Sequence, residues 1–136
     1  QPREVCHCRI GFTVIVGIGV DVVDVARFER ALQRTPTLTS RLFSESEQLK
    51  EGKPRPLRSL AGRFAAKEAL IKALGDSSGV TWHDMQVVSD ALGNPSFELQ
   101  NSTKAIADRR GITSLHLSMS HDAGIAIAYV IAEATP

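Results

Sequence analysis

The fold of this 136-residue chain is decided by residues 57–74, LRSLAGRFAAKEALIKAL. Their apolar positions recur at the spacing of an α-helix, and Gly75 follows as a stop signal. At about 100° per residue, one stripe of this helix is apolar and Glu68 falls near its centre. A carboxylate buried there without a partner costs several kcal/mol of folding free energy. Glu68 therefore needs a cation, either a metal ion or Lys72 one turn later, so the sequence predicts a charged site lined by this helix.

The segments before the long helix predict one buried strand and two helices. The β-branched run at residues 13–20 is typical of a buried strand, with Asp21 just beyond it. A helix is expected over residues 25–34 with Asp24 as its cap. Ser44 and Glu47 are spaced as a capping box that opens a second, short helix, and residues 52–56 are expected to form a loop.

The segments after the long helix are mostly strands. The pattern predicts strands at 85–89 and 96–99 that form a hairpin or lie as near neighbours. A helix is expected over 102–110, followed by two joined strands at 114–120 and 125–132. Helices cluster early and strands pair late, which favours the α+β class. We expect a single domain over residues 13–136, in which a small antiparallel sheet packs against the long helix. Residues 1–12 are expected to form a tail outside it.

Composition restricts the classes of function. The chain is 43% hydrophobic and 23% charged, which fits one compact domain. Its net charge of +1 is too small to make nucleic acid the main partner. The longest apolar run, residues 123–132, is far shorter than the roughly 20 residues that span a bilayer, and the first residues lack the apolar core of a secretory signal. We expect a cytoplasmic protein without membrane contact.

The two cysteines, Cys6 and Cys8, flank His7 near the start of the chain. A zinc site needs three or four ligands at suitable spacing, so this short motif is weak evidence for a metal. A polar tail without a metal-binding role is the favoured interpretation, and the role of the two cysteines stays open.

Asp21 and Glu68 are the candidate metal ligands. Magnesium typically takes one or two carboxylates and completes its shell with waters and substrate phosphates. Arg63, Lys67 and Lys72 add positive charge to the same helix. Two simpler interpretations remain: Asp21 as a turn-capping aspartate, and Glu68–Lys72 as a surface ion pair.

His121 is a further candidate at the end of a strand. Leu115, Leu117 and Met119 alternate inward, so His121 continues the core-facing set. A histidine there can bind phosphate or move a proton. The alternative is a semi-buried histidine whose hydrogen bonds are satisfied within the fold.

Three arginines form a basic ridge on the first predicted helix: Arg27, Arg30 and Arg34. Such a ridge suits an acidic partner helix. An ordinary solvated face is the alternative that composition leaves open.

Three segments together resemble a known family. They are GIGVDVV at residues 17–23, RFAAKEALIKA at residues 63–73 and SMSH at residues 118–121. In order and content they resemble the holo-acyl-carrier-protein synthase type of 4′-phosphopantetheinyl transferase, over roughly residues 14–132. The resemblance implies a magnesium-dependent transfer of 4′-phosphopantetheine from coenzyme A to a serine of an apo acyl carrier protein, for fatty acid biosynthesis. Adenosine 3′,5′-bisphosphate would be released.

The resemblance also implies roles for single residues. Asp21 and Glu68 would bind magnesium on the pyrophosphate, and Lys72 and His121 would hold phosphate oxygens. Arg63 would meet the 3′-phosphate, and Lys67 is assigned to the coenzyme A site with it. The serine proton would go to Glu68 through a metal-bound water or to His121, a choice the sequence leaves open.

The resemblance further implies contacts with the adenine, with the carrier protein and with other copies of the chain. The turn formed by Gly93, Asn94 and Pro95 resembles one that lies near the adenine. Arg27 matches an arginine that docks the carrier, which favours the ridge interpretation. The family is typically a homotrimer with sites shared at subunit interfaces.

Two other classes of protein fit part of the pattern. One is a non-catalytic module that binds coenzyme A or a nucleotide without a metal. The other is a structural trimer module in which Glu68 and Lys72 form only a buried ion pair. The carrier that is served and the tolerance for acyl-coenzyme A stay open.

Overall fold

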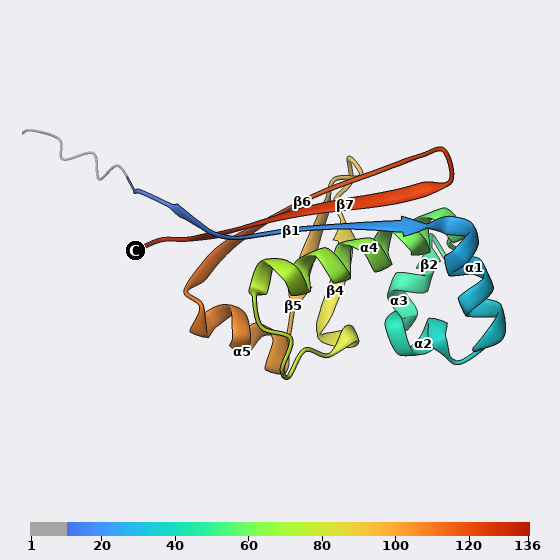
Figure 1. Cartoon of the computed structure of the whole chain (residues 1–136), viewed down its shortest axis with the longest axis horizontal. Coiled ribbons are helices and arrows are strands. Elements are labelled where there is room, and N and C mark those ends of the chain that lie inside the picture. Colours follow the sequence, from blue (N-terminus) through green and yellow to red (C-terminus); the bar gives the residue numbers. More distant parts are fainter. Residues whose placement is uncertain (1–10) are drawn as a thin grey trace, which may run out of the picture.

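The computed structural model describes residues 11–136 and has an α+β fold arranged around one long helix. A three-stranded antiparallel sheet in the order β1-β7-β6 runs along α4 (Leu57–Leu74), as Figure 1 shows. Its strands are β1 (Val14–Asp24), β6 (Ile112–Asp122) and β7 (Ile125–Ala134). The expected α+β class and the antiparallel sheet against a long helix are confirmed.

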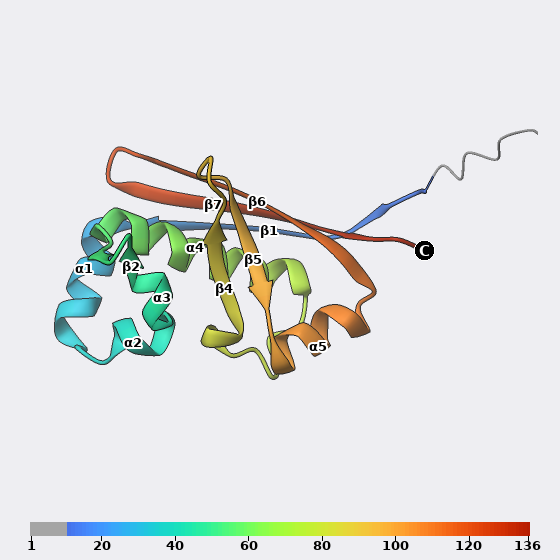
Figure 2. The ribbon, with the colours of Figure 1, turned by 180° about the vertical axis from the view of Figure 1, so that it is seen from behind.

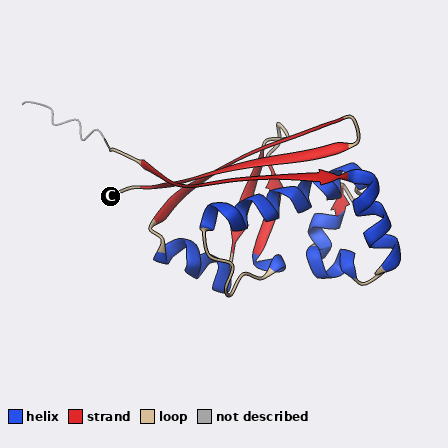
Figure 3. Ribbon diagram, viewed as in Figure 1, coloured by secondary structure: helices blue, strands red, loops and turns tan. Residues whose placement is uncertain are grey.

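The remaining elements gather at the two ends and along another side of α4. The hairpin of β4 (Met85–Ser89) and β5 (Pro95–Leu99) lies behind the helix in Figure 1 and in front of it in Figure 2. Figure 3 shows the short helices grouped at one end and a single helix at the other. The group is α1 (Val25–Arg34), α2 (Leu38–Leu42) and α3 (Glu45–Gln48), and the single helix is α5 (Asn101–Arg109).

Several sequence-based predictions are confirmed at the level of single hydrogen bonds. Asp24 caps α1, because its Oδ1 accepts from the backbone N of Arg27 at 2.9 Å. Ser44 and Glu47 form the capping box of α3. Gly75 ends α4 in the left-handed conformation, with φ of 72°. Both predicted pairs of strands are present, each as an antiparallel hairpin.

Other segments differ from expectation. α2 was not expected, and the predicted loop contains part of a small hairpin of β2 (Leu49–Lys50) and β3 (Lys53–Pro54). A 3-10 turn covers Trp82–Asp84. Within residues 11–136, no helix combines the length and the hydropathy needed to cross a bilayer.

The contact between α4 and β1 is made backbone to backbone. A Cβ at Gly17 would lie 1.9 Å from Ala73 O, and one at Gly19 would lie 1.8 Å from Ala69 O. Only glycine lets the strand come this close to the helix. The small side chains of Ala69 and Ala73 are buried at this contact.

This packing corrects the expected orientation of the helix. Of the predicted apolar stripe, Ala61 is fully buried. The larger members Leu57, Leu60, Phe64 and Ile71 are only partly buried, and Glu68 is half-buried with them. The alanine-rich side takes the sheet because small residues permit the close approach. Glu68 therefore lies at the margin of the core, where solvent and a ligand can reach it.

β1 also corrects an expectation, since it continues through Asp21 and is covered on one face only. Gly19, Asp21 and Val23 point toward the helix side, whereas Ile18 and Val22 are 54% and 57% exposed. Side chains of a strand alternate between its faces, so the outer face of β1 is apolar and open.

Candidate active site

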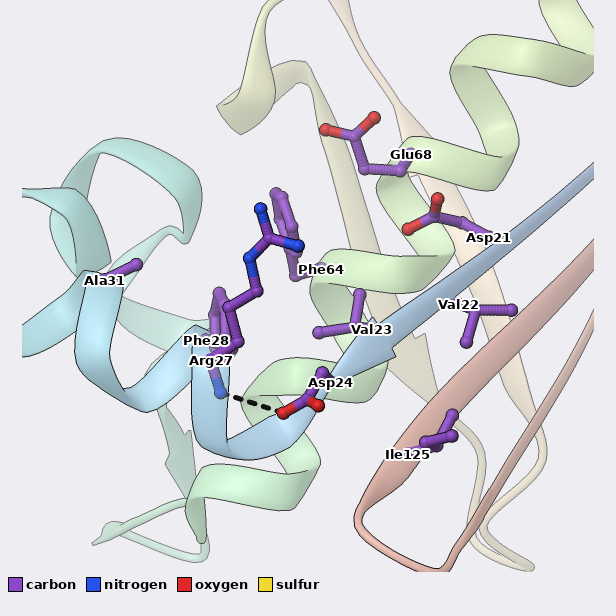
Figure 4. Close-up of a pocket in the computed structure, with 10 residues that line it drawn as sticks. All are labelled: Asp21, Val22, Val23, Asp24, Arg27, Phe28, Ala31, Phe64, Glu68 and Ile125. Atoms are coloured by element: carbon purple, nitrogen blue, oxygen red, sulfur yellow. Dashed lines mark hydrogen bonds between the residues drawn. The ribbon is translucent and has the colours of Figure 1, made fainter.

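A cleft of about 460 Å³ opens where the end of β1, the start of α1 and the middle of α4 meet. We call it the Asp21 cleft, and Figure 4 shows its lining. Asp21 and Glu68 direct their carboxylates into the same space, and Arg27 extends into it from α1. The apolar wall consists of Val22, Val23, Phe28, Ala31, Phe64 and Ile125.

The two carboxylates of this cleft repel each other. The pKa of Glu68 is raised above its ordinary value, first by burial and then by the negative charge of Asp21. Lys72 offsets part of this rise. The cleft thus concentrates negative charge in a partly desolvated place, which is what a cation site requires.

Lys72 pairs with the strand instead of with Glu68. Its Nζ donates to Val20 O at 2.9 Å and to Asp21 Oδ1 at 3.3 Å. The alternative interpretation of Glu68 and Lys72 as an ion pair is therefore wrong. The charge of Lys72 acts on Glu68, but the hydrogen bonds of the ammonium go to β1.

The donor set of the Asp21 cleft fits a hard divalent cation. Within residues 11–136, His, Cys, Asp and Glu side chains do not gather in threes around a possible ion position. A zinc-type site is not formed there, but two carboxylates with open space beside them match magnesium, which keeps waters and takes substrate phosphates. The two residues predicted as metal ligands are thus brought together.

A second, smaller cleft of about 190 Å³ lies between the first half of α4 and the end of β6. We call it the Arg63 cleft, and its lining includes Arg58, Ser59, Met119 and His121. Arg63 is only 5% exposed. Its Nη1 donates to Ser59 Oγ at 2.9 Å, while its buried Nε finds no partner within the described residues.

Arg63 carries a charge that its surroundings neutralise only in part, through the nearby charge of Glu47. Burial, and then repulsion from Arg55, lower its pKa to about 10. A buried guanidinium normally has an anionic partner, because an unpaired buried charge is costly. An anion entering the Arg63 cleft would supply that partner.

Sequence reasoning missed Arg55. Its Nε is also buried without a hydrogen-bond partner among residues 11–136, and burial lowers its pKa. It lies close enough to Arg63 for their charges to interact. The only signal in the sequence was the basic loop KPR at residues 53–55, which composition alone does not distinguish from a solvated turn.

His121 is exposed, which corrects the expected core-facing position. It does share the alternation of Leu115, Leu117 and Met119, but β6 extends past the core before it reaches residue 121. Its side chain therefore faces the Arg63 cleft from the rim.

Lys67 is not at a ligand site. It is fully buried, and its Nζ donates to Glu47 Oε1 at 2.7 Å, to Leu42 O at 2.7 Å and to Trp82 O at 3.0 Å. An ammonium has three donors, so all are used inside the fold. The structure thus corrects the expected role of Lys67 in coenzyme A binding.

The two clefts share no lining residue, so one chain does not assemble all the predicted site residues. Arg63 and Glu68 are five residues apart on α4, which turns their side chains about 140° from each other around the helix axis. A further cleft of about 390 Å³ at the β6–β7 turn is lined by His121 of the Arg63 cleft and by Ile125 of the Asp21 cleft. A single molecule would therefore reach both groups along this turn, around the helix or from a neighbouring chain.

The turn of Gly93, Asn94 and Pro95 lines neither cleft. It closes the β4–β5 hairpin, where Asp90 accepts from the backbone and side chain of Asn94. Hydrogen bonds from Asn94 lower the pKa of Asp90. Arg27, Arg30 and Arg34 are all exposed on α1, as a docking ridge requires, and Arg27 also lines the Asp21 cleft.

Comparison with known proteins identifies close relatives. Residues 17–130 match the model of the 4′-phosphopantetheinyl transferase superfamily. The holo-[acyl-carrier-protein] synthase of Leifsonia xyli subsp. xyli is 59% identical over 120 residues, which cover 88% of this chain and 98% of the relative.

Solved structures of holo-[acyl-carrier-protein] synthases superpose on this chain over most of its length. The holo-[acyl-carrier-protein] synthase of Neisseria meningitidis superposes with a TM-score of 0.79 at 32% identity, covering 88% of this chain and 98% of that one. The Helicobacter pylori holo-[acyl-carrier-protein] synthase in complex with coenzyme A gives a TM-score of 0.72 at 35% identity, covering 85% and 98%.

Proposed function

Because the chain belongs to the 4′-phosphopantetheinyl transferase superfamily, we propose that its two clefts together carry phosphopantetheine from coenzyme A to an apo acyl carrier protein. In this transfer a serine hydroxyl of the carrier attacks the phosphorus that bears pantetheine. The bond from that phosphorus to the bridging oxygen of the pyrophosphate breaks, and adenosine 3′,5′-bisphosphate leaves. The observation that carries the proposal is that the chain has both a two-carboxylate cleft and a buried arginine whose charge is only partly compensated.

Asp21 and Glu68 would hold a magnesium ion. Bound there, the ion would neutralise charge on the pyrophosphate as the leaving group departs. The raised pKa of Glu68 supports this assignment, since the two carboxylates lack a full counter-charge of their own.

Lys72 and His121 would hold phosphate oxygens. Lys72 reaches the Asp21 cleft on a half-exposed side chain, and His121 lies exposed at the rim of the Arg63 cleft. Glu68 and His121 are the two candidate acceptors of the serine proton.

Arg63, with Arg55 beside it, would bind the 3′-phosphate. A phosphate accepts hydrogen bonds and ion pairs from guanidinium groups, and both residues have a buried Nε free among the described residues. This would also relieve the repulsion between the two arginines.

The separation of the clefts supports a site completed between copies of the chain. The outer face of the sheet exposes Ile18, Val20, Val22 and Tyr129. Side by side on paired strands, they form the kind of apolar patch that marks an interface. A homotrimer would bury this face and bring the Asp21 cleft of one copy to the Arg63 cleft of another, with Gly93–Pro95 near the adenine.

The carrier would approach along α1. Arg27, Arg30 and Arg34 are exposed there, and Arg27 projects into the Asp21 cleft (Figure 4), so a docked acidic helix would present its serine to the metal site. The cytoplasmic location and the role in fatty acid biosynthesis stay predictions from the sequence. Cys6 and Cys8 lie outside the described residues.

The direct test is to incubate the chain with coenzyme A, magnesium and an apo carrier and to weigh the carrier. A mass gain equal to the phosphopantetheine arm that depends on magnesium supports the proposal. An unchanged carrier at high enzyme concentration contradicts it. The Glu68→Gln variant is the matched control, and it should give no mass gain while keeping the wild-type circular dichroism spectrum.

A further inference from the structure

Lys72 binds two oxygen atoms at the edge of β1 at once. Its ammonium donates to Val20 O and to Asp21 Oδ1, at 2.9 and 3.3 Å. The lysine side chain is 54% exposed, whereas that of Asp21 is 19% exposed. The carboxylate is thus held in place by the fold, while the lysine is free to turn toward a new partner in the cleft.

The charges of the cleft make this contact more than a surface ion pair. Asp21 and Glu68 together carry two negative charges, and Lys72 is the one cation within residues 11–136 that forms an ion pair with either of them. Arg27 lines the same cleft but forms no ion pair in the described part of the chain. Lys72 therefore neutralises part of the negative charge at Asp21 Oδ1, with which a metal ion would have to compete.

We propose that Lys72 is an exchangeable counter-ion for Asp21, which it leaves for a phosphate oxygen when coenzyme A and the divalent cation bind together. The inference rests on the proposed function, because it assumes that this cleft receives both ligands. A cation arriving alone must displace an ammonium that then has no partner but water. A cation arriving with a pyrophosphate gives that ammonium an anion to bind.

The exchange makes metal affinity conditional on the substrate. Lys72 lowers the affinity of the empty cleft for the metal and raises it once phosphate is present. By linkage, the metal must raise the affinity for coenzyme A by the same factor. The enzyme would then load the two ligands as a pair, and free magnesium would occupy little of the site.

The test is calorimetric titration of Mg²⁺ into the full chain without coenzyme A. Removal of the counter-ion in Lys72→Met should tighten metal binding by about 10-fold, within the usual 5–150-fold range of coupled sites. Lys72→Arg keeps the charge and should bind Mg²⁺ like the wild type. Arg27→Met removes a positive charge from the same cleft without touching Asp21, and its affinity should change by less than about 3-fold because exposed charges without direct contact are screened.

A double variant distinguishes the effect of the direct contact between Lys72 and Asp21 from the effect of positive charge elsewhere in the cleft. In an Asp21→Asn background, Lys72→Met should produce no further tightening, because the lysine has lost the carboxylate it occupies. The inference is overturned if Arg27→Met and Lys72→Met raise the affinity for Mg²⁺ equally. It is also overturned if Lys72→Met binds Mg²⁺ no more tightly than the wild type, or shows no binding at millimolar Mg²⁺. Transfer to the carrier by the wild-type chain is measured separately. An enzyme that transfers the arm but shows no effect of Lys72 on metal binding refutes this inference alone.

Discussion

Lys67 Nζ lies 2.7 Å from Glu47 Oε1, and both side chains are almost wholly excluded from solvent. Glu47 also accepts from the backbone N of Val87 at 3.1 Å, so the pair joins α3, α4 and β4. This buried ion pair links three elements inside the fold. Its lysine, Lys67, directly precedes Glu68 in the sequence.

The first prediction concerns this pair. Lys67→Met leaves Glu47 as an uncompensated buried charge, and removing one partner of such a pair costs about 3–5 kcal/mol. Urea denaturation should show that loss in the free energy of unfolding. The matched control is Lys104→Met, which removes an exposed i,i+4 pair with Asp108 and should cost only about 0.3–0.5 kcal/mol. Similar losses in the two variants would contradict a structural role for Lys67.

A second prediction concerns the approach of α4 to β1. Gly19→Ala would put a Cβ 1.8 Å from Ala69 O, so the helix must move away from the strand. We expect a loss of about 3 kcal/mol or more, above the usual cost of overpacking, because backbone and not a side chain stands in the way. Thermal denaturation measures it. Gly11→Ala is the control, since a Cβ there meets nothing within 4 Å, and a melting temperature lowered equally by both changes would refute the explanation.

Sequence patterning predicted the elements well because they depend on local chemistry. The cap at Asp24, the capping box at Ser44 and the stop at Gly75 each involve contacts within one turn of helix. The convergence of Asp21 and Glu68 on one cleft was also predicted, because a carboxylate removed from water requires a cation and Asp21 was the second candidate ligand for that cation.

The roles of the two lysines of α4 were not predictable in the same way. Lys67 and Lys72 differ in environment because α3 and the 3-10 turn at Trp82–Asp84 pack over the first and leave the second open. Glu47 is 20 residues away in sequence, and helical periodicity says nothing about partners at that distance. Likewise, the β-branched residues of β1 indicate a strand, but they do not say whether its outer face is covered by the same chain.

A third prediction uses the raised pKa of Glu68. A carboxyl group whose pKa is higher in the folded than in the unfolded state binds more protons when folded. Stability is therefore lost as the pH rises from the ordinary value of 4.5 through the raised pKa. In the absence of divalent cations, Glu68→Gln should melt above the wild type at pH 7, and this difference should shrink below pH 4.5.

Asp21→Asn is the companion variant for the pH experiment. It removes the repulsion on Glu68 and should flatten the wild-type pH profile in part, leaving the contribution of burial. A wild-type protein whose stability, relative to Glu68→Gln, does not change between pH 4 and pH 7 would show that the two carboxylates do not interact as described.

A fourth prediction concerns the α1 ridge. Arg30→Glu should raise the KM for the carrier by 10-fold or more, because a charge reversal places like charges at the docking face, while the KM for coenzyme A should change little because Arg30 lines neither cleft. Steady-state kinetics with each substrate varied in turn measure both. Arg41→Glu reverses an equally exposed arginine on α2 and is the control. If both variants raise the carrier KM equally, the ridge has no special role.

The last prediction tests whether the Asp21 and Arg63 clefts act in different copies of the chain. Glu68→Gln damages the first cleft and His121→Ala the rim of the second, and both substitutions are at positions where the fold is not tightly packed. Each variant alone should be inactive or nearly so. Unfolding and refolding them together as an equal mixture should restore about one quarter of wild-type activity, because in a cyclic trimer one interface in four then joins two intact clefts. A mixture no more active than its two components would show that each chain works with its own clefts, and the site would then have to close around α4 within one molecule.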